Sequence, residues 1–263
     1  MPKIRVIPVI LLKNSSIVQS RSFCRYQIIG NPFKAVERIS SWDSDELIYL
    51  EIDEPSTRTS TTIDLMSEIS RRCLVPLSLG GGVRSIDDVD IRISNGADKI
   101  VINSEAIRRP QFITDCANAY GSQCVVISID VKRTKENCWE VFSHGGTQST
   151  SRDSIEWARE VVDRGAGEVL VNSIDRDGSM TGYDLDLFQI LIPEIRVPVI
   201  PLGGAGNWSD METLIKRTGA TSVAAANVFH HKENSVFRAR KYLFEAGLNV
   251  RSPSLTEFNL GQA

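Results

Sequence analysis

An apolar run that ends in an aspartate occurs once intact in this chain and once with the aspartate replaced. Residues 124–132 read CVVISIDVK and residues 5–13 read RVIPVILLK, so Asp130 corresponds to Leu11. Carboxylates that face each other across a site can act as general acid and general base. Because leucine cannot carry a proton, the sequence predicts one catalytic carboxylate, Asp130, whose partner position, Leu11, is inactive.

Two glycine-rich segments could hold phosphate groups. Residues 80–82 read GGG and residues 203–206 read GGAG. Glycine permits positive φ angles and a close approach of backbone N–H groups to an anion, and the start of a following helix favours negative charge. Tight packing of a helix on a strand would explain an isolated glycine pair. Two blocks at corresponding places favour two phosphate sites instead, which would suit an elongated bisphosphate.

Polar residues end several of the predicted strands. They are Asp53, Asn103, Asp130 and Asp175, with the pair Asp177 and Gly178 shortly after the last of these. A single aspartate after a strand is more often a helix cap or a turn residue. Their placement at related points of a repeat nevertheless favours a shared site.

Four charged residues stand near the starts of predicted strands, namely Arg5, Glu46, Lys99 and Glu168. Side chains alternate along a strand, and Arg5 has the parity of Leu11, so both would point to the same side. Two cations and two carboxylates could close a neutral ring, because buried charges need such pairing. A structural salt-bridge cluster and a gate for a small molecule are equally consistent with this set.

Short β-branched runs alternate with amphipathic segments, which is the pattern of successive βα units around a parallel sheet. Eight strands are predicted, at residues 4–11, 46–52, 75–79, 99–103, 124–130, 168–173, 197–202 and 222–226. Helices are predicted at residues 32–41, 63–73, 86–95, 111–120, 154–164 and 209–218.

The two halves of the chain repeat each other at an offset of 122 or 123 residues. The matching segments are 46–53 with 168–175, 80–83 with 203–206, and 96–99 with 219–222. This repeat predicts an α/β fold, a single (β/α)8 TIM barrel over 1–251, made of half-barrels at about 1–122 and 123–251. The tail 252–263 has no barrel pattern, and we expect it to be poorly ordered. An open doubly wound sheet is the alternative, but no GxGxxG follows the first strand.

Charge and cysteine content argue against several classes of protein. The chain has 30 Lys+Arg and 33 Asp+Glu, so it lacks the basic surplus of a nucleic-acid or anionic-membrane binder. The apolar stretch at 6–12 is too short to cross a bilayer. Five widely spaced cysteines without a CxxC favour reduced thiols in a cytoplasmic protein. The histidines lack metal-ligand spacing, so we expect no metal and no other cofactor.

Taken together, these residues resemble the HisF family, the cyclase subunit of imidazole glycerol phosphate synthase. The likeness runs from Arg5 to about Arg251, and its strongest segments are 45–47, 80–83, 96–103, 121–123, 173–178, 181–184, 203–206 and 228–230. The resemblance implies that a HisH-like glutaminase docks at the amino-terminal face of the barrel. Ammonia would then pass a gate formed by Arg5, Glu46, Lys99 and Glu168.

The same resemblance implies a phosphorylated small-molecule ligand at the opposite face, where two aspartates catalyse the reaction. Asp130 matches the second catalytic aspartate, and Leu11 occupies the place of the first. The candidate phosphate-binding residues are Gly81, Gly82, Asn103, Ser104, Asp177, Gly178, Gly203, Gly204, Ala226 and Asn227.

Other departures from the family pattern lie around the same ligand. Gln19 stands where the family usually has lysine, and Leu202 and Asn227 stand where it usually has serine. A general acid or base typically contributes about 10²- to 10⁴-fold to a rate, so losing one of two would badly weaken ring closure.

The sequence Leu-Leu-Lys at 11–13 resembles that of the WbuZ-type paralogues associated with glycosyl amidation. The resemblance implies that the barrel and its glutaminase supply ammonia to a separate sugar amidotransferase. That enzyme would convert an acetamido group of a surface-polysaccharide sugar into an acetamidino group. Two alternatives remain: a cyclase of histidine biosynthesis, in which Asp130 and Asp177 cover for the missing group, and a non-catalytic scaffold that activates the glutaminase.

Overall fold

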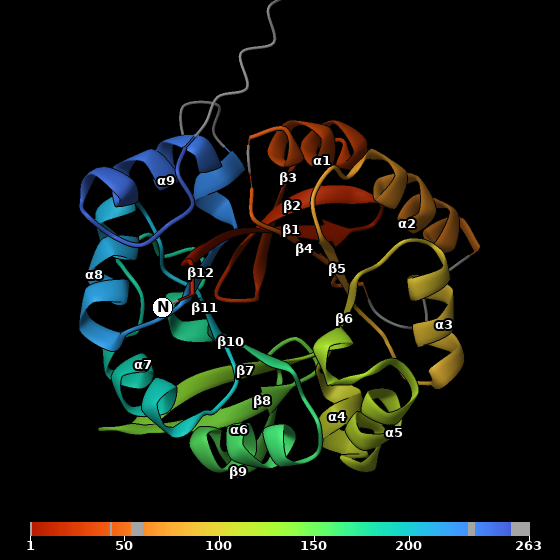
Figure 1. Cartoon of the computed structure of the whole chain (residues 1–263). Helices are drawn as coiled ribbons and strands as arrows, with labels where there is room; N and C mark the ends of the chain where they lie inside the picture. The colour runs from red at the N-terminus through yellow and green to blue at the C-terminus, as the bar shows by residue number, and fades with distance from the viewer. Residues whose placement is uncertain (1, 43, 54–59, 231–234, 254–263) are drawn as a thin grey trace, which may run out of the picture.

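The computed structural model describes residues 2–42, 44–53, 60–230 and 235–253, with the backbone alone described at 60–63. The predicted tail, 252–263, therefore lies outside the described residues from 254 onward. Figure 1 shows strands gathered at the centre of the molecule and helices around them.

Parallel strands form the central wall. In chain order they are β1 (Arg5–Lys13), β4 (Leu47–Glu51), β5 (Leu77–Gly80), β6 (Lys99–Ile102), β7 (Val125–Lys135), β10 (Glu168–Ser173), β11 (Val199–Leu202) and β12 (Ser222–Ala225). Each pairs with the next from β1 to β11, and β12 pairs with β1. The Ser222 hydroxyl donates to the Val199 carbonyl at 2.7 Å, which joins β12 to β11. The (β/α)8 barrel prediction is confirmed.

Helices surround the strands (Figure 1). The described α-helices are α1 (Pro32–Ser40), α2 (Ser60–Arg72), α3 (Ile86–Ser94), α4 (Ser104–Arg108), α5 (Gln111–Tyr120), α6 (Ser154–Asp163), α7 (Leu185–Leu191), α8 (Trp208–Thr218) and α9 (Val236–Glu245). Some of these helices begin directly after a residue whose side chain caps the first turn. Ser85 before α3 and Asn207 before α8 each form a reciprocal capping box with the aspartate three residues on.

The alternation of side chains along the strands divides the apolar core in two. Val6, Ile10 and Leu12 of β1 belong to the larger cluster, which includes the buried faces of the helices. Residues of the opposite parity fill the barrel interior: Ile7, Val9, Leu11, Val18, Ile48, Val101, Val126, Leu170, Ile200, Leu202 and Ala224. Leu11 therefore points into the barrel, as the parity argument required of it and of Arg5.

Two antiparallel hairpins were not predicted. One consists of β2 (Ser16–Arg21) and β3 (Arg25–Gly30) and pairs with β1, and the other consists of β8 (Cys138–Ser143) and β9 (Gln148–Asp153) and pairs with β7. The prediction that Asp130 ends its strand is therefore wrong, because β7 continues beyond the barrel wall into a hairpin. The two hairpins meet, since a Cβ on Gly146 would lie 3.1 Å from Phe23 Cδ2.

Candidate functional site

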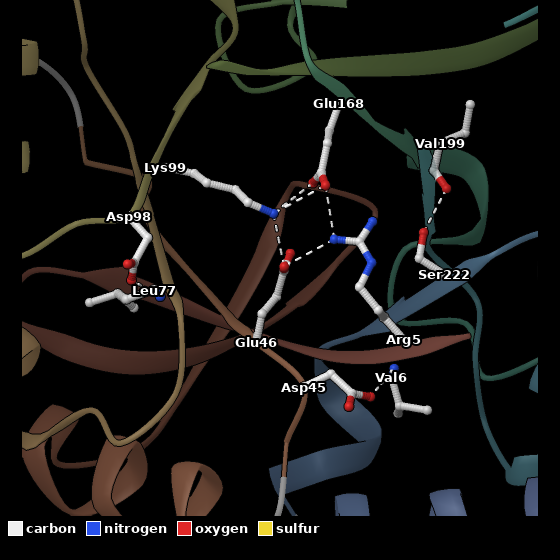
Figure 2. Close-up of polar contacts among 10 residues, drawn as sticks. All are labelled: Arg5, Val6, Asp45, Glu46, Leu77, Asp98, Lys99, Glu168, Val199 and Ser222. Carbon is white, nitrogen blue, oxygen red and sulfur yellow. Dashed lines mark hydrogen bonds and ion pairs between the residues drawn. The ribbon is translucent and has the colours of Figure 1, made fainter. Parts of the chain in front are cut away.

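A closed ring of four charges lies at the amino-terminal end of the barrel (Figure 2). Arg5 Nη1 contacts Glu46 Oε2 at 3.0 Å and Glu168 Oε1 at 2.9 Å. Lys99 Nζ contacts the same two carboxylates at 2.9 and 3.1 Å. The ring is neutral and joins β1, the residue before β4, β6 and β10, so the predicted set of charges is brought together.

Neighbouring aspartates hold the strands that carry this ring. Asp45 Oδ2 accepts from the Val6 backbone N–H at 2.9 Å, and Asp98 Oδ2 accepts from the Leu77 N–H at 2.8 Å (Figure 2). The Asp45 carboxylate also contacts Arg240 at 3.0 Å. Each aspartate directly precedes a ring residue in the chain, so these bonds fix the positions of Glu46 and Lys99.

Asp130 lies at the opposite end of the barrel and is 7% exposed. Its Oδ2 accepts a hydrogen bond from Asn103 Nδ2 at 2.7 Å. Burial raises the pKa of Asp130 to about 7, the Asn103 bond lowers it in part, and the charge of Asp177 raises it further. A carboxyl group with a pKa near neutrality can take up or release a proton at physiological pH.

Asn103 occupies a position that normally caps a helix. It directly precedes α4, yet its side chain caps none of the helix N–H groups and instead turns to Asp130. Its Oδ1 is buried and has no hydrogen-bond partner. An unpartnered buried acceptor costs about 1–3 kcal/mol, so a bound donor would relieve this cost.

Asn172 is a site residue that the sequence analysis missed. It pairs in register with Asp130 on the adjacent strand, so both side chains point into the barrel. It is 8% exposed, and its Oδ1 is buried without a partner. The available signal was its parity with Glu168, four residues earlier on the same strand, which places both on the inner face.

The other side of the mouth is apolar. Leu11 of β1 is 9% exposed and Leu202 of β11 is 5% exposed, and Ala226 after β12 packs against the same inner cluster. Polar groups therefore come from β6, β7 and β10, while β1, β11 and β12 contribute hydrocarbon. Among the described residues of these six strands and the residues that follow them, Asp130, the carboxyl group that can exchange a proton, lies on the polar side.

Three of the predicted phosphate-binding residues contact Ser20 of β2. Asp177 Oδ2 accepts from the Ser20 hydroxyl at 2.6 Å, and Asn227 Nδ2 donates to the Ser20 carbonyl at 2.8 Å. Gly178 has φ +64°, and a Cβ there would lie 2.2 Å from the same carbonyl oxygen. Burial raises the pKa of Asp177, and its hydrogen bonds from Ser20 and the Phe23 N–H oppose that rise. These contacts, which we call the Ser20 clasp, hold the β2–β3 hairpin over the mouth.

The glycine loops meet the requirement for close backbone approach. Gly81 has φ +104° and Gly203 has φ +101°, and a Cβ would lie 2.1 Å from Glu51 O or 2.7 Å from Ser173 O, respectively. Both positions thus admit only glycine on packing grounds alone, before any ligand is considered. The structure places Gly82 and Gly204 in these loops and Ser104 at the start of α4, where its Oγ accepts from the His144 N–H at 3.3 Å.

Asp53 and Asp175 bond to backbone N–H groups of the extended strands. Asp53 accepts hydrogen bonds from the Asn14 N–H at 2.9 Å, and Asp175 Oδ2 accepts from the Arg133 N–H at 2.8 Å. Each aspartate anchors the extension of the preceding inner strand. These hydrogen bonds agree with the turn-residue alternative for the two aspartates, and a site shared by all four strand-end residues stays a prediction.

The described residues contain neither a candidate metal-binding cluster nor a candidate membrane-spanning helix. No group of three or more His, Cys, Asp or Glu side chains in the described part of the chain could hold a metal ion. Every described helix is too short or too polar to span a bilayer.

Comparison with known proteins places this geometry in a family. Residues 5–235 match the family described as histidine biosynthesis protein. The imidazole glycerol phosphate synthase subunit HisF of Streptococcus mutans serotype c is 38% identical over 251 residues, which is 95% of this chain and 100% of the relative. A barrel with its charged ring, glycine loops and buried mouth carboxyl agrees with that match, and the chain belongs to the histidine biosynthesis protein family as a HisF-like barrel.

Proposed function

We propose that this protein is the ammonia-conducting barrel subunit of a glutamine-dependent amidation system. The observation that carries the proposal is the contrast between the two ends of the barrel. The ring of Arg5, Glu46, Lys99 and Glu168 is complete, whereas Leu11 stands where a second mouth carboxylate would be needed for ring closure.

In this proposal a HisH-like glutaminase docks at the amino-terminal face and releases ammonia beside the charged ring. The apolar interior above the ring favours passage of neutral ammonia over ammonium, because an unpaired charge in such surroundings is costly. Ammonia then leaves at the barrel mouth and reaches a separate sugar amidotransferase. The resemblance to the WbuZ-type paralogues implies this route. The acceptor would be an acetamido sugar of a surface polysaccharide.

Reconstitution with the glutaminase and the amidotransferase tests this function. We expect a stable complex, stimulated glutamine hydrolysis, and amidated sugar in proportion to the glutamate formed. Lys99→Met should break that proportion by releasing ammonia to solvent, whereas Lys241→Met, at an exposed position of α9, should leave it unchanged. Absence of both complex formation and stimulated hydrolysis would rule the proposal out.

A cyclase of histidine biosynthesis is the second candidate, and two observations favour it. The HisF relative is 38% identical, and Asp177 lies close enough to Asp130 to raise its pKa, so the two carboxyls could form a substitute pair. An assay with the bisphosphate substrate and ammonium at alkaline pH decides between the candidates. Leu11→Asp should raise a weak cyclase activity if this second candidate is correct, and no activity in either protein rejects it.

A scaffold that only activates the glutaminase is separated from both candidates by Asp130→Asn. Unchanged amidation in the reconstituted system would favour the scaffold. A large loss would assign Asp130 a chemical task.

A further inference from the structure

We infer that Asn103, Asp130 and Asn172 form an ammonia-binding site at the inner edge of the barrel mouth. The inference rests on the proposed function and adds to it the place where the conducted molecule is held. Asn103 directly follows β6, Asp130 lies in β7 and Asn172 lies in β10, and these three strands are neighbours in the barrel wall.

Hydrogen-bonding capacity identifies the ligand. Asn103 Oδ1 and Asn172 Oδ1 are both buried without partners, and the Asp130 carboxyl is buried with one bond from Asn103. The two unpartnered amide oxygens are acceptors, and the Asp130 carboxylate adds acceptor capacity when it is ionised. Ammonia has three N–H donors and a single lone pair, and ammonium has four donors, so a small nitrogen donor matches these acceptors.

Position along the barrel supports the same ligand. Glu168 and Asn172 lie on one face of β10, four residues apart, which corresponds to about 13 Å along the strand. Leu170 stands between them in the inner apolar cluster, together with Val126 of the adjacent strand β7 and Val101 of β6. The buried residue Ser128 lies beside Leu170 on β7, so a molecule that passed the charged ring and this layer would meet Ser128 first and then Asn172 and Asp130.

The opposite wall provides no group that would bind an anion at the same spot. Leu11 and Leu202 line it and offer no donor for a carboxylate or phosphate. Water remains a competitor because it also donates hydrogen bonds, so the test must separate ammonium from solvent and from ionic strength.

The experiment follows the side-chain amide resonances of Asn103 and Asn172 by NMR in the full-length barrel. Ammonium chloride is the probe, and tetramethylammonium chloride, which has the same charge but no N–H, is the matched salt. We expect saturable shifts with ammonium alone. Asn172→Leu should weaken the apparent affinity by about tenfold or more, since it removes an acceptor, while Asn172→Asp keeps acceptors and should retain binding.

Asn118→Leu, at an exposed position of α5, serves as the control and should titrate like the wild type. Equal shifts with both salts, or an Asn172→Leu titration identical to that of the wild type, would overturn the site. Asn103→Leu gives a second variant in case Asn172→Leu does not fold. The titration needs the barrel alone. If the barrel fails to bind ammonium but still stimulates the glutaminase, the inferred site is wrong and the proposed function stands. If the barrel binds ammonium but does not stimulate the glutaminase, the proposed function is wrong.

Discussion

Asp130 is a carboxyl group whose environment opposes ionisation. It is almost fully buried, its one hydrogen bond comes from Asn103, and the nearby Asp177 adds a like charge. The pKa of about 7 follows from burial more than from either neighbour. Such a group is suited to proton transfer, and it also makes the folded state sensitive to pH.

Asp130→Asn should stabilise the protein increasingly as pH rises. The folded-state pKa, about 7, is above the ordinary value of 3.8, so the folded state binds more protons than the unfolded state between these values. The contribution of this group to the free energy of unfolding is therefore most favourable at low pH, and it is lost as the pH rises toward 7. We expect the gain from Asp130→Asn to be about 2–3 kcal/mol larger at pH 8 than at pH 5.

Urea unfolding of both proteins at the two pH values measures this difference. Asparagine can still accept the bond from Asn103, so the variant removes the charge without removing the contact. An equal change in unfolding free energy at pH 5 and pH 8 would contradict the raised pKa.

Residue types alone separated the functional carboxylates from the structural ones only in part. Asp130 was found because its apolar run repeats at Leu11, and the structure places it in the buried mouth. Asp53 and Asp175 repeat equally well, yet they anchor strand extensions, because the fold needs that anchor in both halves. Asn172 was missed because its role depends on which neighbour lies beside it in the sheet, and that register is not visible in one strand.

At the scale of elements, the two extended inner strands carry the largest departure from the predicted fold. The wall strands were predicted because their β-branched runs are continuous. The hairpins were not, since β9 reads QSTSRD and lacks the apolar alternation that marks a strand, and β3 is largely exposed. Tertiary pairing with β2 and β8 determines these strands more than their own composition does.

Gly178→Ala should loosen the β2–β3 hairpin. A methyl group there would collide with the Ser20 carbonyl oxygen, and alanine disfavours φ +64°. The Ser20 clasp would open, and trypsin should cut after Arg21 or Arg25 faster than in the wild type. Gly145→Ala is the matched control, because Gly145 has φ +62° but no atom within 4 Å of the added carbon.

Time courses of limited proteolysis followed by mass spectrometry distinguish the two variants. Equal cleavage rates in both would mean that the backbone angle, and not the contact with Ser20, controls the hairpin. Ser20→Ala, which removes the hydroxyl that donates to Asp177, should accelerate cleavage in the same direction as Gly178→Ala.

At the scale of the molecule, the strand extensions repeat around the barrel, but the distribution of polar groups at the mouth does not. β1 and β7 are each extended and followed by a hairpin, and the aspartate after the next wall strand anchors each extension. The mouth does not share this symmetry, since its polar groups lie on β6, β7 and β10 and its apolar groups on β1, β11 and β12. The charged ring at the other end draws one residue from each of four places in the wall and so links both halves.

Glu168→Gln should destabilise the whole barrel, because it leaves two ring cations opposite one carboxylate. The ring side chains are 6 to 23% exposed, so solvent screens the uncompensated charge poorly. We expect a loss of about 3 kcal/mol in unfolding free energy. Asp163→Asn, in an ion pair with Arg196 whose side chains are 68 and 70% exposed, is the matched control and should cost less than about 0.5 kcal/mol.

The double variant Glu168→Gln with Lys99→Met tests whether charge balance is the cause. It removes one charge of each sign and keeps the contact between Arg5 and Glu46 at 3.0 Å. Denaturant unfolding should then show that the second substitution restores part of the stability lost through the first. Additive losses would instead mean that packing at the barrel floor, and not neutrality of the ring, governs stability. Because the ring joins β1, β6 and β10, which are far apart in the chain, restored stability should also return unfolding to a single cooperative transition if Glu168→Gln has split it.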